Sequence, residues 1–555
     1  MKTIPHVGYA GSLGLVIAIF WSLGAIEAKS ETLAAAPITT QLWRPIELSF
    51  TAESDHPDPF DFEHTKFIAV FEGPENQRLE VPGFWDGGRT WRIRFTPTKI
   101  GEWSYRTSFS DGVDQGLDRK SGRLHIGAAR SANAVQQHGG FLKVSENHRY
   151  LTFSDGTPFF WLGDTWWAVP SANVPFANFQ RMVDRRVEQG YTLFQAHGFM
   201  PLSFEPKGGI GAFTATRTPD EETVRYWQEV DKYFSYAEEK GMIGVFGFST
   251  AIHLDRLPLS DIHRLWRYYL ARYGAYPVTF LITQEYNEKP DERVEQISRL
   301  LKLGQFIKDS DPWKRAMTAH SWVHSHEGFP AEKEPWHDFT MLQGGHSLGL
   351  YEKFYRALWE RTPVKPFVQS EANYEGFINR AKFSDATVIR HTAYTAIQTG
   401  CFGFTYGAQG LYGSITDRSK PGTTAKWGPV LTWEEGLALP GGAQLAHLRK
   451  CYESLEWWKL DPVSNAIKPA ADVLVKADGD KTLLLYFPPQ VKVSDGAVLT
   501  GVSKGFHFRA EWFDPRTGNR IELGLGLFSS DAGLSLPQRP DDNDWLLILH
   551  RRGGR

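Results

Sequence analysis

Short apolar runs alternate with longer amphipathic stretches through the middle of the chain, from about residue 140 onward. The apolar runs occupy residues 159–167, 191–199, 242–248, 278–285, 315–322, 339–346, 366–375 and 401–410. The stretches between them have helical periodicity, as in VPFANFQRMVDRRVEQG and ERVEQISRLLKLGQFIKD, and Gly190 and Gly241 stand where helix C-caps belong. The runs are continuously apolar, which indicates parallel strands covered on both faces.

Eight strands that alternate with helices over roughly 270 residues predict a (β/α)8 barrel. A doubly wound open sheet is the main alternative. That fold carries a glycine-rich phosphate loop after its first strand, and no such loop follows the first apolar run of this chain. The pattern therefore favours the barrel.

The regions on either side of the barrel show short alternating runs typical of half-buried strands. On the N-terminal side TWRIRF alternates with period two, and Asp86-Gly87-Gly88 marks a hairpin turn. After Trp457-Trp458 the chain returns to strand-like segments such as KTLLLYFPP and DNDWLLILHR. The sequence thus predicts an α/β protein with a (β/α)8 TIM barrel at residues 138–458, flanked by an N-terminal Ig-like β-sandwich at 41–127 and a C-terminal β-sandwich at 463–551.

The first 28 residues have the features of an export signal. Lys2 supplies a weak positive charge, an apolar stretch runs from about Val7 to Ile26, and Ile26-Glu27-Ala28 is a tolerable cleavage site. We expect a periplasmic or secreted protein with no stable membrane insertion after removal of residues 1–28. Because the apolar stretch is long, an uncleaved anchor is the alternative.

Composition narrows the range of partners. The formal net charge is -3 and no run is rich in Lys and Arg, which argues against nucleic acid. Aromatic residues make up 14% of the chain, including 20 Trp, and such flat side chains suit sugar faces as well as a large core. Cys401 and Cys451 are too few for a cysteine metal site, and their apolar and helical surroundings favour free thiols over a disulfide.

Carboxylates end two of the eight apolar runs. The C-terminal ends of barrel strands carry the catalytic groups of such enzymes, and Glu285 ends run four while Glu371 ends run seven. Strands four and seven approach the barrel mouth from opposite sides, so the two side chains can face each other across a bound sugar. A carboxylate pair about 5–5.5 Å apart gives a retaining glycosidase, and a pair about 6.5–9.5 Å apart gives an inverting one.

Two neighbouring glutamates are weaker candidates. Glu288 lies just before Lys289-Pro290, where a helix starts, so we interpret it as an N-terminal helix charge. Glu375 lies past the end of its strand beside Gly376, where it is expected to orient Tyr374 or a loop.

Other polar and aromatic residues at the strand ends are candidate substrate contacts. Asp164 either caps local backbone N–H groups or holds sugar hydroxyls, with Trp166 or Trp167 as a platform. The histidines at positions 197, 320 and 346 lie on separate strands without metal-site spacing, so hydrogen bonding to substrate or packing is expected rather than metal binding. The predicted substrate-binding residues are Asp164, Trp166, Trp167, His197, Asn287, His320, His346, Tyr374 and Tyr406, with no metal or other cofactor.

Several of these segments carry a resemblance to a known family. FWLGDTWW, SEANYEGF and GCFGFTYGAQGLYG are similar to the apiosidase-like catalytic domain of glycoside hydrolase family 140 and its relatives. VPGFWDGGRTWRIRFTPTKIGEWSY resembles the β-sandwich that commonly precedes that domain, and the C-terminal AEWFDPRTG segment resembles a small collagen-binding-type sandwich.

The resemblance implies hydrolysis of a glycosidic bond by a retaining mechanism, on a carbohydrate substrate such as plant-type polysaccharide. It places the acid/base on Glu285 and the nucleophile on Glu371. The family's fourth strand often ends in a Gly-Gly-Asp type motif, whereas this chain has Gln284-Glu285, so sugars other than apiose stay open. The alternative functions are a non-catalytic glycan- or matrix-binding protein and a metal-assisted amidase or protease on the same barrel.

Overall fold

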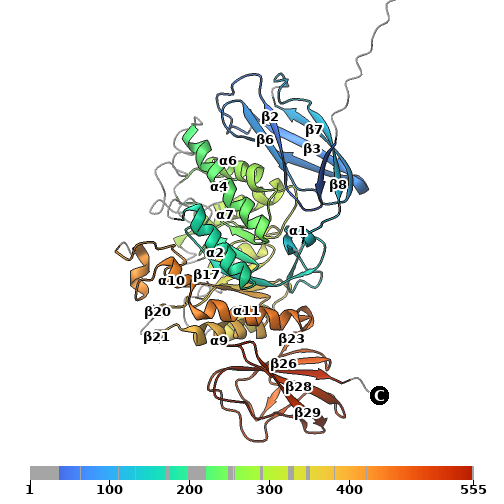
Figure 1. Ribbon diagram of the computed structural model, residues 1–555, viewed down its shortest axis with the longest axis vertical. Helices are drawn as coiled ribbons and strands as arrows, with labels where there is room; N and C mark the ends of the chain where they lie inside the picture. The colour runs from blue at the N-terminus through green and yellow to red at the C-terminus, as the bar shows by residue number, and fades with distance from the viewer. Residues whose placement is uncertain are drawn as a thin grey trace, which may run out of the picture. The chain divides into compact units, whose positions relative to one another are not determined.

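The computed structural model describes residues 37–552, apart from the gaps 63, 111, 132, 171–173, 198–220, 248–253, 256, 288–291, 323–329, 345–350, 380–381 and 420–421. The described residues form one compact unit (Figure 1). The predicted signal segment, Glu288 and His346 lie outside the described residues. The predicted domain limits stay predictions, because the barrel and the sheets on either side of it belong to this one unit.

A parallel sheet of nine strands lies at the centre of the unit. In order of pairing the strands are β16 (Met317–Thr318), β15 (Val278–Leu281), β14 (Ile243–Phe246), β13 (Leu193–Ala196), β12 (Trp161–Thr165), β22 (Gly403–Tyr406), β19 (Phe367–Glu371), β18 (Thr340–Gln343) and β17 (His320–Trp322). Only Ala319 separates β16 from β17, so the two ends of the order meet and the sheet closes as a TIM-like barrel. Each of the eight predicted apolar runs contributes to it.

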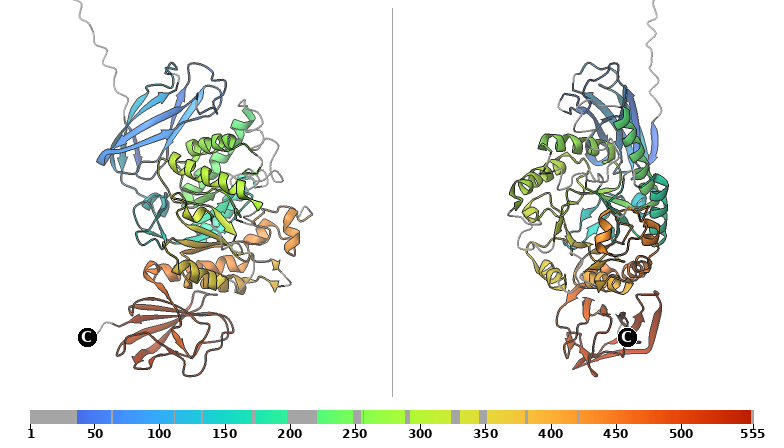
Figure 2. Two further views of the ribbon diagram at one scale, coloured as in Figure 1. Left: turned by 180° about the vertical axis from the view of Figure 1, so that it is seen from behind. Right: turned by 90° about the vertical axis from the view of Figure 1, so that its left-hand side faces the viewer.

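Helices cover the outside of this barrel (Figure 2). They are α2 (Phe176–Glu188), α4 (Glu221–Lys240), α6 (Leu259–Tyr273), α7 (Val294–Ser310), α8 (Tyr351–Glu360), α9 (Ala386–Gln398) and α11 (Pro440–Glu453). The short helix α10 (Trp433–Leu437) lies against the loop that follows β22. Gly190 and Gly241 follow the ends of α2 and α4 with φ of 78° and 80°, a left-handed conformation that favours glycine. Both predicted C-caps are confirmed. Between β17 and β18 the described residues contain the 3-10 turn η4 (Pro330–Lys333).

Smaller elements surround the barrel. A short helix and a three-stranded sheet precede its first strand: α1 (Ala134–His138), β9 (Lys143–Val144), β10 (Leu151–Thr152) and β11 (Pro158–Phe159). The hairpin β20 (Ile378–Asn379) and β21 (Lys382–Phe383) follows β19, the strand that ends in Glu371.

Two sheets precede the barrel region. One pairs β1 (Ile38–Gln41), β8 (Ser121–Gly127), β7 (Gly101–Phe109), β3 (Phe67–Gly73) and β4 (Gln77–Pro82), and the other pairs β2 (Ile46–Thr51), β6 (Thr90–Phe95) and β5 (Phe84–Trp85). The turn predicted at Asp86–Gly88 joins β5 to β6 as a hairpin. The rings of Phe71 in β3 and Phe95 in β6 stack with centroids 3.8 Å apart, so the two sheets share an aromatic core.

Arg94 departs from the half-buried pattern expected of TWRIRF. Its side chain alternates with the core residues of β6, yet only 5% of it is exposed. The Arg94 guanidinium binds both carboxylate oxygens of Asp231 in α4, at 3.0 and 2.6 Å. Arg272 in α6 binds the same carboxylate at 2.8 and 2.6 Å. Barrel helices therefore cover this face of β6, and a buried ion-pair network joins the N-terminal sheets to the barrel.

The chain ends in a nine-stranded antiparallel sheet. In order of pairing its strands are β23 (Asp461–Val463), β25 (Leu474–Asp478), β26 (Thr482–Phe487), β31 (Trp545–Arg551), β28 (His507–Phe513), β29 (Arg520–Ser530), β30 (Gly533–Ser535), β27 (Val498–Leu499) and β24 (Ile467–Lys468). Every residue of β26 is buried. Leu484 and Tyr486 belong to the core shared with the barrel, and Leu483 and Leu485 belong to the sheet's own core. Burial on both faces explains the continuous apolar run KTLLLYF.

The two cysteines are core residues. Cys401 precedes β22 and Cys451 lies in α11, and both are buried and free. Burial raises the pKa of the Cys451 thiol to about 12, so this thiol is un-ionised at physiological pH. The expectation of two free thiols is confirmed.

Asp231→Asn tests the ion-pair network. Burial alone would raise the pKa of Asp231, but Arg94 and Arg272 outweigh burial and hold this pKa below its ordinary value. The substitution removes the carboxylate that Arg94 and Arg272 share, while Arg94 keeps its pair with Glu47 and Arg272 its pair with Asp86. We therefore expect the free energy of unfolding to fall by about 1.5–3 kcal/mol at neutral pH in denaturant melts.

The same variant has an expected pH dependence. Because the folded-state pKa of Asp231 is lowered, its stabilising contribution is present above the unfolded pKa and is lost as the pH falls through the folded pKa. Wild type and variant should therefore converge in acid. Glu229→Gln, which breaks the exposed pair with Lys232, is the control and should cost less than about 1 kcal/mol. Equal stability of wild type and Asp231→Asn at neutral pH would show that the ion-pair network does not stabilise the fold.

Candidate active site

Glu371 is placed by the backbone of two neighbouring strands. The sequence FVQSE of β19 is buried along its whole length and delivers Glu371 to the carboxyl end of the barrel, where only 8% of this residue is exposed. The register between β18 and β19 shifts after Leu342, which sets Gln343 opposite Glu371. Irregularities of this kind re-aim side chains beside functional sites.

Three side chains surround the Glu371 carboxyl group. Tyr374 and Gln343 are hydrogen-bonded to it, and Nε2 of His320 lies 3.5 Å from Oε2 of Glu371. Burial lowers the pKa of His320 to about 3, so the imidazole is neutral near physiological pH. Glu371 therefore has polar neutral neighbours on these sides and no imidazolium to hold it ionised.

Trp167 extends this wall of side chains. Its indole Nε1 donates to the Tyr374 hydroxyl at 3.1 Å. Its ring lies 4.6 Å from the ring of His197 and 5.9 Å from the ring of His320, measured between centroids. The structure thus brings together four of the residues predicted to contact substrate, and places Tyr374 between Trp167 and the Glu371 carboxyl group.

Glu285 stands on a loop and not at the tip of its strand, which corrects the sequence interpretation. β15 ends at Leu281, four positions earlier. Glu285 has φ of 49°, a left-handed conformation that is uncommon for a residue with a side chain and that clusters at functional sites. Its Oε1 accepts a hydrogen bond from Nε2 of Gln343 at 2.7 Å, and its carbonyl oxygen accepts one from Arg293 at 3.2 Å.

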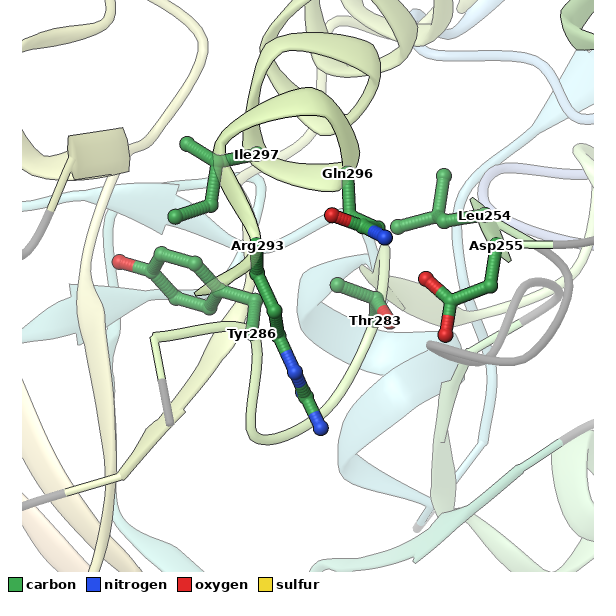
Figure 3. Close-up of a pocket in the computed structure, with 7 residues that line it drawn as sticks. All are labelled: Leu254, Asp255, Thr283, Tyr286, Arg293, Gln296 and Ile297. Atoms are coloured by element: carbon green, nitrogen blue, oxygen red, sulfur yellow. The ribbon is translucent and has the colours of Figure 1, made fainter. Parts of the chain in front are cut away.

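Arg293 also lines a small pocket next to the Glu285 loop. Figure 3 shows its side chain leaving the start of α7, with Tyr286 on one side and Thr283 on the other. The cavity volume is about 10 Å³, room for about one water molecule. Its other lining residues are Leu254, Asp255, Gln296 and Ile297. The pocket is too small for a sugar, so we interpret Arg293 as a support for the Glu285 backbone.

The two carboxyl groups influence each other's protonation. Burial, and secondly the charge of Glu285, raise the pKa of Glu371 to about 8, although the hydrogen bonds from Tyr374 and Gln343 act in the opposite direction. Two like charges in a site with little water resist joint ionisation. The pair therefore retains one proton at neutral pH, which is the protonation state that acid-assisted displacement requires.

Asp164, Trp166 and Tyr406 lie in a second cluster that is fully buried. Oδ2 of Asp164 accepts hydrogen bonds from Nε of Arg186 at 2.6 Å and from Nε1 of Trp166 at 2.9 Å. Tyr406 donates to Glu375 at 2.6 Å, and the Arg186 guanidinium lies over its ring. None of the three predicted residues has surface for a sugar. Arg186 and Trp166 take up the Asp164 carboxylate, and Glu375 takes up the Tyr406 hydroxyl. We therefore interpret all three residues as structural, which corrects their expected role as substrate contacts.

Two predicted substrate-binding residues remain, and the site also contains one residue that was not predicted. Asn287 is fully buried beside the Glu285 loop, and His346 lies outside the described residues. Sequence reasoning missed Gln343 as a site residue. Like Glu371, Gln343 is a polar residue at the end of an apolar run. A neutral amide is not an acid, a base or a nucleophile, so the sequence alone does not mark it as a site residue.

A family model for the apiosidase-like catalytic domain matches residues 145–459, more than half of the 555 residues. The chain belongs to the apiosidase-like family. The apiosidase-like region contains all nine strands of the barrel sheet and both Glu285 and Glu371, and the protein is a glycoside hydrolase. A second match, to a domain of unknown function (DUF5060), covers residues 39–110 in the N-terminal sheets.

Solved structures share this fold at low sequence identity. A candidate glycoside hydrolase from Bacteroides vulgatus ATCC 8482 is 17% identical with a TM-score of 0.70, over 93% of this chain and 100% of that chain. A glycoside hydrolase family 5 protein from the same organism is 20% identical with a TM-score of 0.62, over 74% and 94%. At these identities the likeness shows the fold alone. Comparison with curated proteins gives no match.

Glu371→Gln tests the buried carboxyl group of the apiosidase-like domain without any substrate. Because burial raises the pKa of Glu371 from 4.5 to about 8, the folded protein binds this proton more tightly than the unfolded chain. The resulting stabilisation is full below the unfolded pKa and is lost as the pH rises through about 8. Glutamine has no charge to bury, so the variant should melt well above wild type in alkali and close to it in acid.

Thermal melts across the pH range measure this difference. Glu360→Gln, at an exposed position in α8, is the matched control and should follow wild type throughout. A melting difference between Glu371→Gln and wild type that stays constant with pH would show that Glu371 does not titrate in this range.

Proposed function

We propose that Glu285 and Glu371 are the catalytic pair with which this glycoside hydrolase cleaves its glycosidic bond. The observation that carries the proposal is the shared contact with Gln343, whose amide binds Glu285 at 2.7 Å and is also hydrogen-bonded to Glu371. Two carboxyl groups held together in a buried site, with one proton between them, match the requirements of acid-assisted glycosyl transfer.

A retaining mechanism is part of this proposal, on the resemblance to the apiosidase-like family. Retaining enzymes have carboxyl groups about 5–5.5 Å apart, whereas inverting enzymes need about 6.5–9.5 Å to admit a water molecule. The hydrogen bond from Gln343 to Glu285 and the influence of the Glu285 charge on the pKa of Glu371 support a shared site for the two carboxyl groups, as either spacing requires.

In the proposed reaction Glu371 is the nucleophile and Glu285 the acid/base. A Glu371 oxygen bonds to the anomeric carbon while the bond to the leaving oxygen breaks, and Glu285 gives its proton to that oxygen. A water molecule then transfers a proton to Glu285 while the water oxygen bonds to the anomeric carbon, and the ester bond to Glu371 breaks. Both carboxyl groups return to their starting state.

Substrate must shift the shared proton for these roles. In the free protein burial leaves the proton on Glu371, but a nucleophile reacts as the carboxylate. The transition state carries positive charge near the anomeric carbon, which favours ionised Glu371, and the bonds from Tyr374 and Gln343 act in the same direction. The raised pKa of Glu371 also supports a second assignment, in which Glu371 is the acid and Glu285 the nucleophile.

For substrate we propose side-chain sugars of complex, plant-type polysaccharide. Trp167, which is 7% exposed and lies beside His197 and His320, is the candidate platform for the sugar ring. The family name points to apiose. This chain has Gln284-Glu285 in place of a Gly-Gly-Asp type motif, and a Glu side chain reaches one methylene further than an Asp side chain. Apiosides and other furanosides and pyranosides therefore belong in the substrate panel.

We propose that the protein acts outside the cytoplasm. The support is the N-terminal apolar stretch that ends near Ala28. In the part of the chain that the structure describes, no helix is both long and apolar enough to cross a membrane. Mass spectrometry of the N-terminus of the protein recovered from its native host tests cleavage after residue 28.

Activity should depend on both glutamates. Glu371→Gln removes either the nucleophile or the acid, so we expect turnover of a substrate found in a panel of polysaccharides and aryl glycosides to fall by at least about 10³-fold, with the fold intact. Anomer-resolved NMR of the first-formed product should show the configuration of the substrate. Wild-type-like activity of Glu371→Gln sinks the catalytic assignment, and an inverted product sinks the retaining mechanism.

Azide separates the two role assignments. In a retaining enzyme that lacks its nucleophile, azide takes the place of the nucleophile and gives a glycosyl azide of inverted configuration. In a retaining enzyme that lacks its acid/base, azide attacks the glycosyl-enzyme and gives a glycosyl azide of retained configuration. We expect Glu371→Ala to give the inverted azide and Glu285→Ala the retained azide. The opposite pairing would establish Glu371 as the acid/base.

A further inference from the structure

Gln343 occupies a position common to both carboxyl groups. It ends β18, and only 3% of the residue is exposed. Its Nε2 donates to Oε1 of Glu285 at 2.7 Å, and its side chain is also hydrogen-bonded to Glu371. Because the register shift after Leu342 sets Gln343 opposite Glu371, the contact is built into the pairing of β18 with β19.

We propose that Gln343 is a positioning residue that holds the two carboxyl groups of the catalytic pair at one spacing while the pair carries a single proton. The proposal rests on the function proposed above for Glu285 and Glu371.

A primary amide suits this task better than a charged donor. It offers two N–H groups on one nitrogen and carries no charge. A lysine or arginine between the carboxyl groups would stabilise both as carboxylates and remove the proton that the acid must supply. A neutral donor can bind either group in either protonation state. Within the described residues the amide oxygen of Gln343 has no hydrogen-bond partner, as expected of an amide oriented by its N–H groups.

The two contacts change in opposite directions during the proposed reaction. The hydrogen bond to Glu285 strengthens as Glu285 gives up its proton and becomes charged, because bonds to ionised acceptors are stronger. The bond to Glu371 weakens as that carboxylate becomes a neutral ester. Because a positioning residue sets the geometry of the reacting carboxyl groups and not the binding of the sugar, its loss should lower kcat more than it raises KM.

Gln343→Met tests the role, because methionine has similar length and no donor. Without the amide the ionised form of each carboxyl group is less favoured, so each pKa rises. We expect both limbs of the pH profile of kcat/KM to move to higher pH, and kcat to fall about 10- to 100-fold, the range of one hydrogen bond to a charged group. Gln343→Asn keeps the donors on a shorter side chain and should shift the limbs less, in the same direction.

Gln195→Met is the matched control. Gln195 is also a buried barrel amide, but its Nε2 donates to Thr165 at 3.0 Å and to the carbonyl oxygen of Ser370 at 2.8 Å, and not to a carboxyl group. We expect this variant to lose stability and to keep both limbs of the profile in place. If Gln343→Met and Gln343→Asn also leave both limbs in place, Gln343 has only a packing role and the proposal is overturned.

A titration that needs no substrate separates this proposal from the proposed function. The melting-temperature difference between wild type and Glu371→Gln grows with pH and levels off at the pKa of Glu371 in the folded protein. In the Gln343→Met background this levelling-off should move to higher pH. An unmoved levelling-off with an inactive Glu371→Gln variant overturns the role of Gln343 alone. A moved levelling-off with an active Glu371→Gln variant overturns the proposed function, and the role of Gln343 with it.

Discussion

The burial of the Glu371 carboxyl group beside a second, half-buried carboxyl group, that of Glu285, is the constraint around which this barrel mouth is built. Glu371 is almost without exposed surface, and the charge of Glu285 adds to the cost of ionising it. The structure tolerates the pair because Gln343 and Tyr374 donate to it and because one proton stays with it at neutral pH. The same site holds Glu285 in a left-handed backbone conformation, which is uncommon for a residue with a side chain.

The rest of the molecule holds this arrangement from several sides. The buried pair of Asp164 with Arg186 ties the first barrel strand to the first barrel helix. Glu375, four residues after Glu371, accepts from Tyr406 and from the backbone N–H of Gly441 near the start of α11. The N-terminal sheets are joined to α4 and α6 through Arg94, and α9 packs on the C-terminal sheet through the stacked rings of Tyr394 and Tyr486.

The barrel could be predicted because its strands are covered on both faces, so each appears in the sequence as a continuous apolar run that needs no knowledge of its partners. The site was only partly predictable for the opposite reason. Asp164 and Glu371 look alike in sequence, an acid at the end of a buried strand, and what separates them is Arg186, 22 positions beyond Asp164 on a helix. The left-handed turn that carries Glu285 has no glycine to announce it.

The roles of Gln343 and Arg94 could not be predicted from the sequence for a related reason. Gln343 gains its meaning only when the register of β18 and β19 sets it between two carboxyl groups. Arg94 has the sequence pattern of a solvated strand residue until α4 brings Asp231 to it. In both cases the contact that decides the role joins two separate elements. The local pattern of apolar and polar residues does not reveal such contacts.

The most direct test of this account is whether the free protein carries a protonated carboxyl group at this site. Infrared difference spectroscopy between wild type and Glu371→Gln isolates the carbonyl stretch of the Glu371 carboxylic acid. The account predicts a carboxylic-acid band at neutral pH that disappears with a midpoint near pH 8. Carboxylate bands alone at neutral pH would contradict it, because the pair would then have no proton to give to a leaving group.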